Sequence, residues 1–206
     1  MRQSSVEAVY KRILDITVTL AALAVLWPVM AAVALIILLT MGKPVLFRQV
    51  RPGQYEEPFV LLKFRTMVES QSSEIDPSTD VARLTRVGNV LRRFSLDELP
   101  QLWNVLLGEM SLVGPRPLLM EYLNYYTPEQ AKRHLMKPGI TGLAQVKGRN
   151  AITWEQKFLW DTWYVDHWSF WLDLRILLST VGKVIRHEHI SQPGHATIEK
   201  FGAERR

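Results

Sequence analysis

The chain has 206 residues, which suits one ordinary domain with an appendage rather than two full domains. Apolar residues make up 48% of the chain and charged residues 22%, which excludes a disordered protein, and the absence of cysteine excludes disulfide scaffolds, cysteine zinc sites and thiol catalysis. The 25 Lys and Arg residues against 20 Asp and Glu give a net charge of +5, which favours an anionic partner such as nucleic acid, anionic lipid or a phosphorylated small molecule.

The first feature along the chain is an uncharged, mostly aliphatic block over residues 16–42. Its 27 residues would form a helix about 40 Å long, which exceeds the roughly 30 Å hydrocarbon core of a bilayer. The block is too long for the apolar region of a cleaved signal peptide, and a buried core helix of this length is unusual in so small a protein. The sequence therefore predicts a membrane segment.

Pro28 divides this block into two arms, each about 18–21 Å long as a helix. Proline removes a backbone donor and clashes with the preceding turn, so it kinks or breaks a helix. Basic residues flank the block on both sides: Arg2, Lys11 and Arg12 before it, and Lys43, Arg48 and Arg51 after it. Because basic flanks favour the cytoplasmic side, a re-entrant hairpin that turns at Pro28 would keep both inside, and a kinked span is the alternative.

The rest of the chain is predicted to form short helices with little β structure. Two β segments, residues 45–50 and 59–67, flank a turn at residues 51–54. Helices are predicted over residues 84–94, 99–107, 128–135, 154–166 and 172–186. Non-helical segments are predicted as a mobile loop at 69–80, an extended or turning loop at 110–118, a glycine-rich loop at 137–150 and a polar tail from residue 187.

The tryptophans are unevenly distributed, with five of seven between residues 154 and 171. Trp favours the membrane–water interface, and the apolar run at residues 171–185 is typical of a helix lying in the plane of that interface. The alternative is that these rings are core aromatics and that the run is a buried helix.

The strongest candidates for chemistry are the adjacent carboxylates of Asp97 and Glu98. Ser95 and Glu98 have the spacing of a capping box, whereas Pro100 favours a helix that begins nearer residue 99. Either arrangement puts the two acids at a helix entrance, where the helix dipole keeps a carboxylate ionised. Such a carboxylate can attack phosphorus or hold Mg²⁺, and a purely structural cap is the alternative.

Basic residues occur around this pair in a pattern suited to phosphate. Lys63 ends a β segment, Arg92 precedes the acids, Arg116 lies between two prolines and Arg149 ends the glycine-rich loop. Arginine suits bidentate phosphate contacts, so these residues indicate a phosphate-bearing substrate at a bilayer surface. The histidines lack metal-ligand spacing, and no Walker A, G-x-G-x-x-G or G-x-S-x-G motif is present.

Three segments make the chain similar to a known family: LLKFRTM at residues 61–67, SLDELPQLWNVLLGEMSLVGPRPL at 95–118 and PGITGLAQVKGRN at 138–150. It resembles the bacterial sugar transferases, in the minimal form of the monotopic phosphoglycosyl transferases. Residues 149–158 and the tail look most like the bacillosaminyl-phosphate transferases of protein glycosylation.

The resemblance implies an enzyme that moves a sugar 1-phosphate from a UDP-sugar to undecaprenyl phosphate and releases UMP in two Mg²⁺-dependent steps. It implies that Asp97 is the nucleophile and a Mg²⁺ ligand, and that Glu98 assists it. The other matching site residues are substrate-binding or lie near the site: Lys63, Arg92, Arg116, Arg149 and Asp161.

The resemblance also implies an α+β fold: a mostly helical, small cytoplasmic domain with a short β-hairpin, on an N-terminal re-entrant membrane helix-break-helix. Residues 1–43 would form the membrane hairpin, turning at Pro28, and residues 44–206 the catalytic domain. The family often has Ser before this proline, whereas this chain has Trp27, so the break would rest on Pro28 and packing.

The expected location is the bacterial inner (cytoplasmic) membrane, with membrane lipid as a partner and no nucleic acid. An N-acetylated amino sugar is the expected donor sugar, with galactose or glucose as the alternative. A non-enzymatic, membrane-anchored binder of phosphate or nucleic acid is the competing function. The glycoconjugate pathway and the oligomeric state, a homo-oligomer included, stay open.

Overall fold

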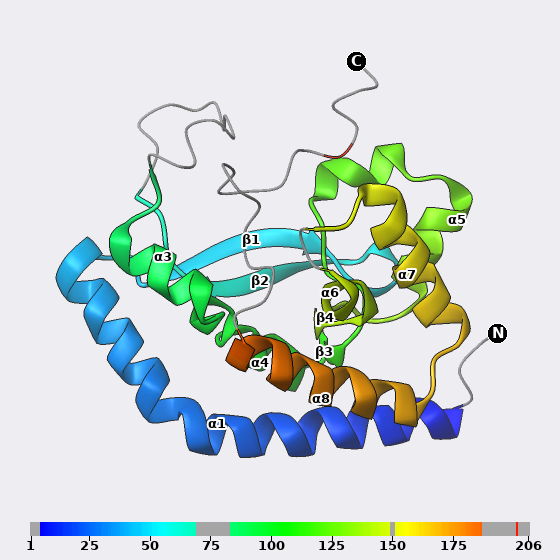
Figure 1. Ribbon diagram of the computed structural model, residues 1–206, viewed down its shortest axis with the longest axis horizontal. Helices are drawn as coiled ribbons and strands as arrows, with labels where there is room; N and C mark the ends of the chain where they lie inside the picture. The colour runs from blue at the N-terminus through cyan, green and yellow to red at the C-terminus, as the bar shows by residue number, and fades with distance from the viewer. Residues whose placement is uncertain (1–4, 69–82, 149–150, 187–200, 202–206) are drawn as a thin grey trace.

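The computed structural model describes residues 5–68, 83–148, 151–186 and 201, and it has the predicted α+β architecture (Figure 1). One long helix, α1 (Ser5–Met41), runs beneath a small domain of short helices and two small sheets. The predicted mobile loop at 69–80, the tail from 187 apart from Phe201, and Arg149 lie outside the described residues.

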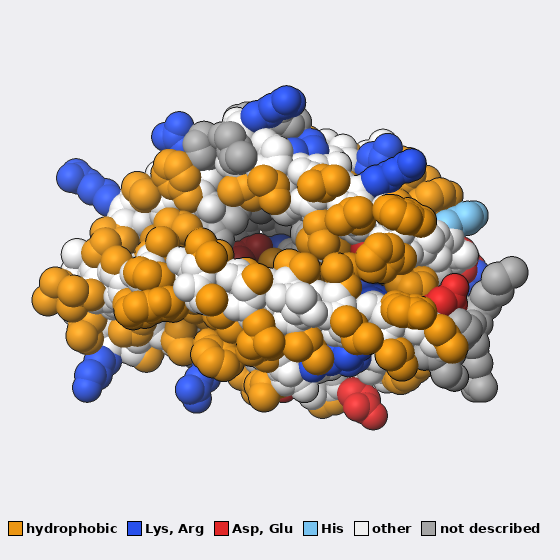
Figure 2. Space-filling view, turned by 90° about the horizontal axis from the view of Figure 1, so that it is seen from below, with side chains coloured by type: hydrophobic (Ala, Val, Ile, Leu, Met, Phe, Trp, Pro, Cys, Tyr) orange, Lys and Arg blue, Asp and Glu red, His pale blue; other side chains and the backbone are white. Residues whose placement is uncertain are grey.

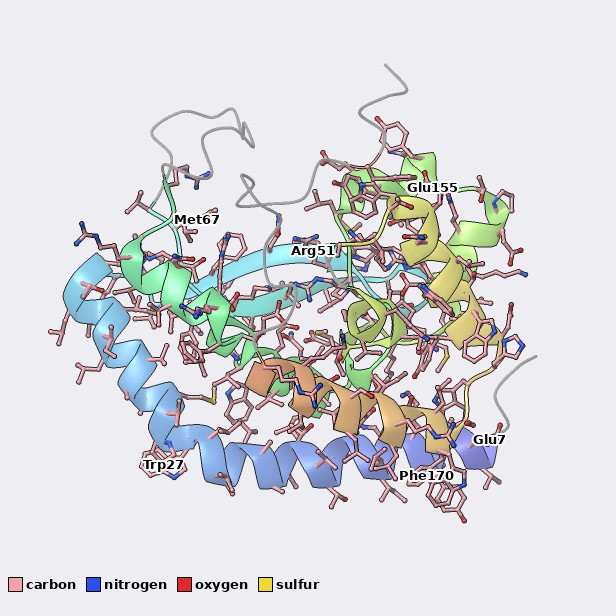
Figure 3. All side chains as sticks on the ribbon, in the orientation of Figure 1. Glu7, Trp27, Arg51, Met67, Glu155 and Phe170 are labelled. Carbon is pink, nitrogen blue, oxygen red and sulfur yellow. The ribbon has the colours of Figure 1, made fainter. Side chains whose placement is uncertain are left out.

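Helix α1 is continuous through Pro28 but bends near Trp27, which lies at the elbow (Figure 3). By length and composition this helix is able to cross a membrane: an 18-residue window of it has a mean hydropathy of 2.7 and only 11% of that window is buried. Trp27 is 63% exposed, so tertiary packing of its ring contributes little to the bend. Apolar side chains cover much of the face seen from the α1 side (Figure 2).

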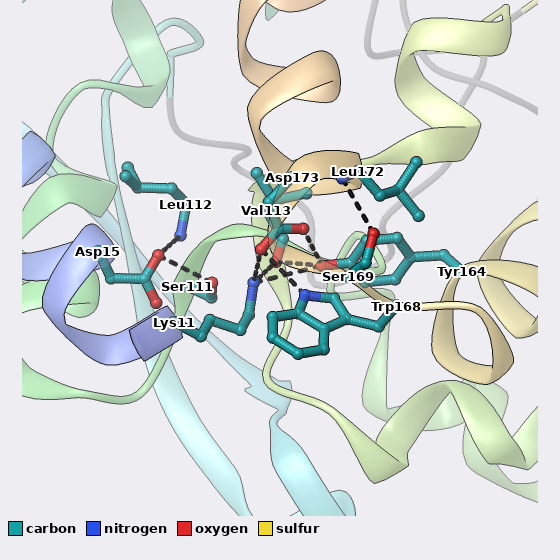
Figure 4. Close-up of polar contacts among 10 residues, drawn as sticks. All are labelled: Lys11, Asp15, Ser111, Leu112, Val113, Tyr164, Trp168, Ser169, Leu172 and Asp173. Carbon is teal, nitrogen blue, oxygen red and sulfur yellow. Dashed lines mark hydrogen bonds and ion pairs between the residues drawn. The ribbon is translucent and has the colours of Figure 1, made fainter. Parts of the chain in front are cut away.

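Both arms of α1 pack against the same domain. Lys11 and Asp15, on the first arm, are buried in a polar network with the domain (Figure 4). The Lys11 ammonium donates to Asp173 at 2.5 Å and to the Val113 carbonyl at 3.0 Å. Val33 and Ile37, on the second arm, belong to a separate apolar cluster that the domain completes with Phe64 and Leu91.

The predicted β-hairpin is present, as β1 (Leu46–Pro52) paired antiparallel with β2 (Pro58–Phe64). The turn between the strands lies later than predicted, at residues 53–57, because Arg51 and Pro52 continue β1, and a 3-10 turn, η1 (Gln54–Glu56), joins the strands. The main core packs Phe59 and Leu61 of β2 against the helices behind the hairpin.

The predicted helices are present with small changes in their ends. They are α3 (Arg86–Arg93), α4 (Gln101–Leu107), α5 (Pro128–Ala131) continued by η5 (Lys132–Leu135), α7 (Trp154–Asp166) and α8 (Phe170–Arg186). Gly108 ends α4 with φ 85°, a left-handed conformation that glycine adopts without strain. A further 3-10 segment, η4 (Met120–Tyr125), lies between these helices.

The prediction of loops at residues 110–118 and 137–150 was wrong in part. A parallel pair, β3 (Ser111–Val113) and β4 (Gly139–Thr141), crosses the core, and α6 (Leu143–Lys147) follows β4. A Cβ on Gly139 would lie 2.1 Å from the Gly114 nitrogen, so glycine is required here for the close approach of two backbones.

The tryptophan-rich region has both core and exposed rings, so the two alternatives apply to different residues. Trp171 is 70% exposed at the start of α8, whereas Trp168 donates a hydrogen bond to the buried Asp173. Helix α8 buries Ile176 in the core and exposes Leu178 and Val181. This helix therefore has the amphipathic character expected of an interfacial helix.

Candidate active site

Helix α3 is held in place by its first turn, and it carries Arg92. The Thr85 hydroxyl accepts from the Gly88 N–H at 2.9 Å, which caps the helix, and it donates to the Thr66 carbonyl at 3.2 Å. At the other end of α3, the Arg92 Nε donates to the Thr66 Oγ1 at 3.1 Å. The segment that follows β2 therefore fixes both ends of the helix.

The predicted capping box at Ser95 and Glu98 was wrong. Ser95 has φ 55°, a left-handed conformation, and its side chain caps nothing, while its N–H bonds to the Arg92 carbonyl. The chain reverses here into a 3-10 turn, η3 (Leu96–Glu98), and Pro100 is the N-cap of α4 rather than a residue of its first turn. Asp97 and Glu98 thus lie in the tight connection between α3 and α4.

Glu98 is held by two cations from different elements. Its Oε1 accepts from the Lys63 Nζ at 2.8 Å and from the Arg116 Nη2 at 2.6 Å. The Glu98 side chain is 12% exposed, Lys63 20% and Arg116 41%. Burial alone would raise the pKa of Glu98, but Arg116 and Lys63 outweigh it and hold this pKa well below its ordinary range. Glu98 is therefore an ionised, paired carboxylate.

Asp97 has a different environment from its neighbour. It is only 7% exposed, and none of the described residues donates a hydrogen bond to its carboxylate. Burial, reinforced by the charge of Glu98, raises the pKa of Asp97, while Lys63, Arg92 and Arg116 oppose the shift. The pKa values of the two adjacent carboxylates are thus shifted in opposite directions. Such a difference is common where one carboxylate reacts and the other helps to position the reacting groups.

Arg116 is positioned by a second layer of buried charges. The Arg133 guanidinium donates to the Arg116 carbonyl at 2.8 Å and to the Asp161 carboxylate at 2.7 Å. Asp161, predicted near the substrate, is 3% exposed, and its structural role is to pair with Arg133 behind Arg116. Sequence reasoning missed Arg133, because a basic residue in the short segment 128–135 carries no signal that its side chain is buried.

The structure thus brings together Lys63, Arg92, Asp97, Glu98 and Arg116, with Asp161 one step behind them. Arg149 lies outside the described residues, so its predicted contact is not tested.

The donor set also fits a Mg²⁺ ion that is shared with a substrate. No group of three or more Asp, Glu or His within the described ranges is arranged to hold a metal by itself. Mg²⁺, however, is commonly held by one or two carboxylates together with substrate phosphates and waters. Because Lys63 and Arg116 already engage Glu98, Asp97 is the carboxylate suited to such an ion.

Comparisons with known proteins show the family to which the chain belongs. The family described as "Bacterial sugar transferase" matches residues 6–187. The chain therefore belongs to the bacterial sugar transferase family.

Similar proteins in this family differ in how much of their length the chain covers. An uncharacterized sugar transferase of Bacillus subtilis, EpsL, is 52% identical over 94% of this chain and 96% of its own length. A UDP-glucose:undecaprenyl-phosphate glucose-1-phosphate transferase of Caulobacter vibrioides is 43% identical over 85% of this chain and 69% of its own length. A UDP-galactose-lipid carrier transferase of Erwinia amylovora is 37% identical over 86% of this chain, which spans only 41% of that relative.

Proposed function

We propose that this protein transfers a sugar 1-phosphate from a UDP-sugar to undecaprenyl phosphate and releases UMP. The observation that carries the proposal is the asymmetric carboxylate pair: Glu98 is neutralised by Lys63 and Arg116, while Asp97 has no donor among the described residues. The named functions of the relatives support the same reaction class, because they use UDP-glucose or UDP-galactose and a lipid carrier.

The proposed reaction has two steps through one covalent intermediate. A carboxylate oxygen of Asp97 attacks the phosphorus that carries the sugar, the bond from that phosphorus to the UMP oxygen breaks, and UMP leaves with the electron pair. An oxygen of undecaprenyl phosphate then attacks the same phosphorus, which releases Asp97 and forms a lipid diphosphate sugar. Splitting the transfer in this way avoids crowding three anionic groups together at once.

Each remaining side chain has a proposed part in these steps. Arg116 and Lys63 hold Glu98 as an anion and also present positive charge to the phosphates, while Arg92 lies close enough to favour the ionised form of Asp97. Bound Mg²⁺, held by Asp97 and substrate oxygens, would reduce repulsion between the carboxylate and the diphosphate.

We further propose that α1 is a re-entrant hairpin and that the domain faces the cytoplasm at the inner membrane. Contacts at both ends of the helix support this: Lys11 bonds to Asp173, and Arg65 donates to the carbonyl of Gly42 at 2.6 Å. A span would separate one of these ends from the domain by the thickness of the bilayer.

The catalytic proposal is tested by replacing Asp97→Asn and measuring UMP release from a UDP-sugar with Mg²⁺ and undecaprenyl phosphate. We expect the rate of UMP release to fall at least a thousandfold, because the Asn amide is a much weaker nucleophile than the Asp carboxylate. Asp166→Asn is the matched control, since that carboxylate is exposed on α7 and should be dispensable. Wild-type rates in the Asp97→Asn variant would refute the assignment of the nucleophile.

The donor sugar is tested with a panel of UDP-sugars. The sequence resemblance favours an N-acetylated amino sugar, whereas the named functions of the relatives favour glucose or galactose. We retain the amino sugar as the proposal, and faster turnover of UDP-glucose or UDP-galactose would replace it.

The topology is tested with single cysteines, which the cysteine-free chain makes unambiguous. Val6→Cys and Asp166→Cys each introduce an exposed thiol, one on α1 and one on the domain. We expect a membrane-impermeant reagent to label both from the same side of sealed vesicles, and labelling from opposite sides would contradict the hairpin.

A further inference from the structure

Phe201, the described residue of the C-terminal tail, lies in a cluster of aromatic rings. The centre of its ring is 4.9 Å from that of Phe158 and 5.5 Å from that of Trp154, both on α7. It is also 5.7 Å from the ring of Tyr122, on η4, and 5.9 Å from that of Tyr126, which follows η4. The Phe201 N–H donates to the Tyr122 hydroxyl at 3.2 Å. Phe201 therefore joins two elements that are distant from each other in the chain.

This aromatic cluster is separate from the apolar core. Tyr122 and Phe158 are 5% and 3% exposed, yet neither belongs to the main core or to the apolar cluster around Val33. Phe201 meets Tyr122 and Phe158 edge to face, a geometry in which aromatic rings attract each other. The cluster is thus a well-packed unit of its own, and the residue that it encloses indicates its role.

The enclosed residue is Arg133, on η5. Its guanidinium carbon lies 5.5 Å from the centre of the Phe158 ring and 5.8 Å from that of the Tyr126 ring, and its Nη1 donates to the Tyr126 hydroxyl at 3.2 Å. Both rings that contact Arg133 also contact Phe201. Arg133 is only 3% exposed, so its polar contacts are made away from water, where they are stronger than at the surface.

Arg133 connects the aromatic cluster to the candidate active site. Its Nη2 donates to the Asp161 carboxylate at 2.7 Å and to the Arg116 carbonyl at 2.8 Å. A proline on each side of Arg116 restricts the backbone there, so fixing this carbonyl also limits where the Arg116 side chain can point. That side chain donates to the Glu98 Oε1 at 2.6 Å. Direct contacts therefore lead from the Phe201 ring to the carboxylate pair.

We propose that Phe201 is a positioning residue of the active site: its ring holds the aromatic cluster around Arg133, and Arg133 places Arg116 against Glu98. This inference rests on the proposed function, in which Arg116 presents positive charge to the substrate phosphates. A cation that is fixed before the substrate binds stabilises developing charge better than a mobile one, because it needs no reorganisation during the reaction.

The first test compares Phe201→Ala with wild type in the full-length protein. We expect kcat/KM for UMP release to fall about 10- to 100-fold, the range for a small displacement of a catalytic group by a remote change. Phe201→Leu keeps most of the apolar volume and should lose less than Phe201→Ala. Ile176→Val, in the main core on α8, is the control: it should lower the melting temperature but change kcat/KM less than about twofold.

The pH profile separates positioning from a loss of stability. Burial raises the pKa of Asp97, and four charged groups act on it: Glu98, which raises it further, and Lys63, Arg92 and Arg116, which lower it. Among the three cations, Arg116 is the one that Arg133 contacts. If Arg116 withdraws in Phe201→Ala, the acid limb of UMP release should move to higher pH by about 0.5–1 unit. Ile176→Val should leave the limb in place.

A measurement without substrate tests the packing itself. In Phe201→Ala, the backbone amides of residues 126–135 and 154–161 should exchange hydrogen faster than in wild type, because the rings around Arg133 lose a neighbour. The amides of β1 and β2, which Phe201 does not contact, should exchange at the wild-type rate.

Three results would overturn the inference: an unchanged kcat/KM in Phe201→Ala, a fall in kcat/KM with the acid limb in place, or unchanged exchange in both segments. If Phe201→Ala does not fold, the same outcomes are read from Phe201→Leu. Failure of the wild type to release UMP from any UDP-sugar would refute the proposed function instead. Hydrogen exchange would still decide whether Phe201 holds the cluster around Arg133.

Discussion

The ion pair between Lys11 and Asp173 is expected to contribute strongly to stability because it is almost completely buried. The two side chains are 8% and 1% exposed, and Asp173 also accepts from the Tyr164 hydroxyl at 2.6 Å and the Trp168 Nε1 at 3.0 Å. Lys11→Met would leave the Asp173 carboxylate buried with neutral donors alone. Breaking a buried pair from one side costs about 3–5 kcal/mol, which is a drop of about 10 °C in melting temperature for a chain of this size.

The assay is a double-mutant cycle with Lys11→Met, Asp173→Asn and the double variant, unfolded in detergent with denaturant. Because Asn keeps an oxygen for Tyr164 and Trp168 without the charge, the double variant should be at least about 2 kcal/mol more stable than the sum of the single losses predicts. Lys43→Met, exposed just beyond the other end of α1, is the control and should change stability by less than about 0.5 kcal/mol. Additive single losses, or a Lys11→Met loss below about 1 kcal/mol, would refute the reasoning.

Other predictions concern the packing of α3 and two buried titratable groups. Gly88→Ala should cost about 1–3 kcal/mol and slow UMP release, because the new Cβ would lie 1.9 Å from the Thr66 carbonyl oxygen and push α3 away; wild-type melting would contradict this. Burial and Arg133 lower the pKa of His134 from 6.5 to about 4. Between these pH values the imidazole binds a proton in the unfolded chain but not in the folded one. The free energy of unfolding should therefore fall by up to about 3 kcal/mol as the pH decreases from 6.5 to 4. His134→Gln should flatten that dependence in denaturation curves measured at each pH. The raised pKa of Asp97 places the acid limb of the pH profile of UMP release above pH 3.8. Glu98→Gln removes a charge that raises this pKa, so the variant should shift the acid limb to lower pH. A shift to higher pH would contradict the expectation.

The sequence predicted those features whose signal is local. Residues 154–166 form α7 as expected, because Thr153 caps the helix and Gln156 completes a capping box. The same type of motif failed at Ser95, because Glu98 is drawn to Lys63 and Arg116 and the Ser95 N–H is already bonded to Arg92. Those partners come from other elements, so their competition is not visible in the motif.

The layer behind the site was not predictable for the same reason. The pairing of Arg133 with Asp161 joins residues 28 positions apart, and the parallel contact of β3 with β4 depends on two glycine backbones in close approach. A basic residue in a short helix and a glycine-rich segment are both more typical of exposed structure. Only tertiary packing reveals that Arg133 and Gly139 are buried.

The contact between Lys11 and Asp173 also sets an order of events during synthesis. The two residues are 162 positions apart in the chain, and at 5–20 residues per second Asp173 is made about 8–30 s after Lys11. Helix α1 is therefore synthesised long before Asp173, the partner of Lys11 on α8. We expect the nascent helix to enter the membrane first. The domain would then pack against the N-terminal end of this helix only when translation is nearly finished.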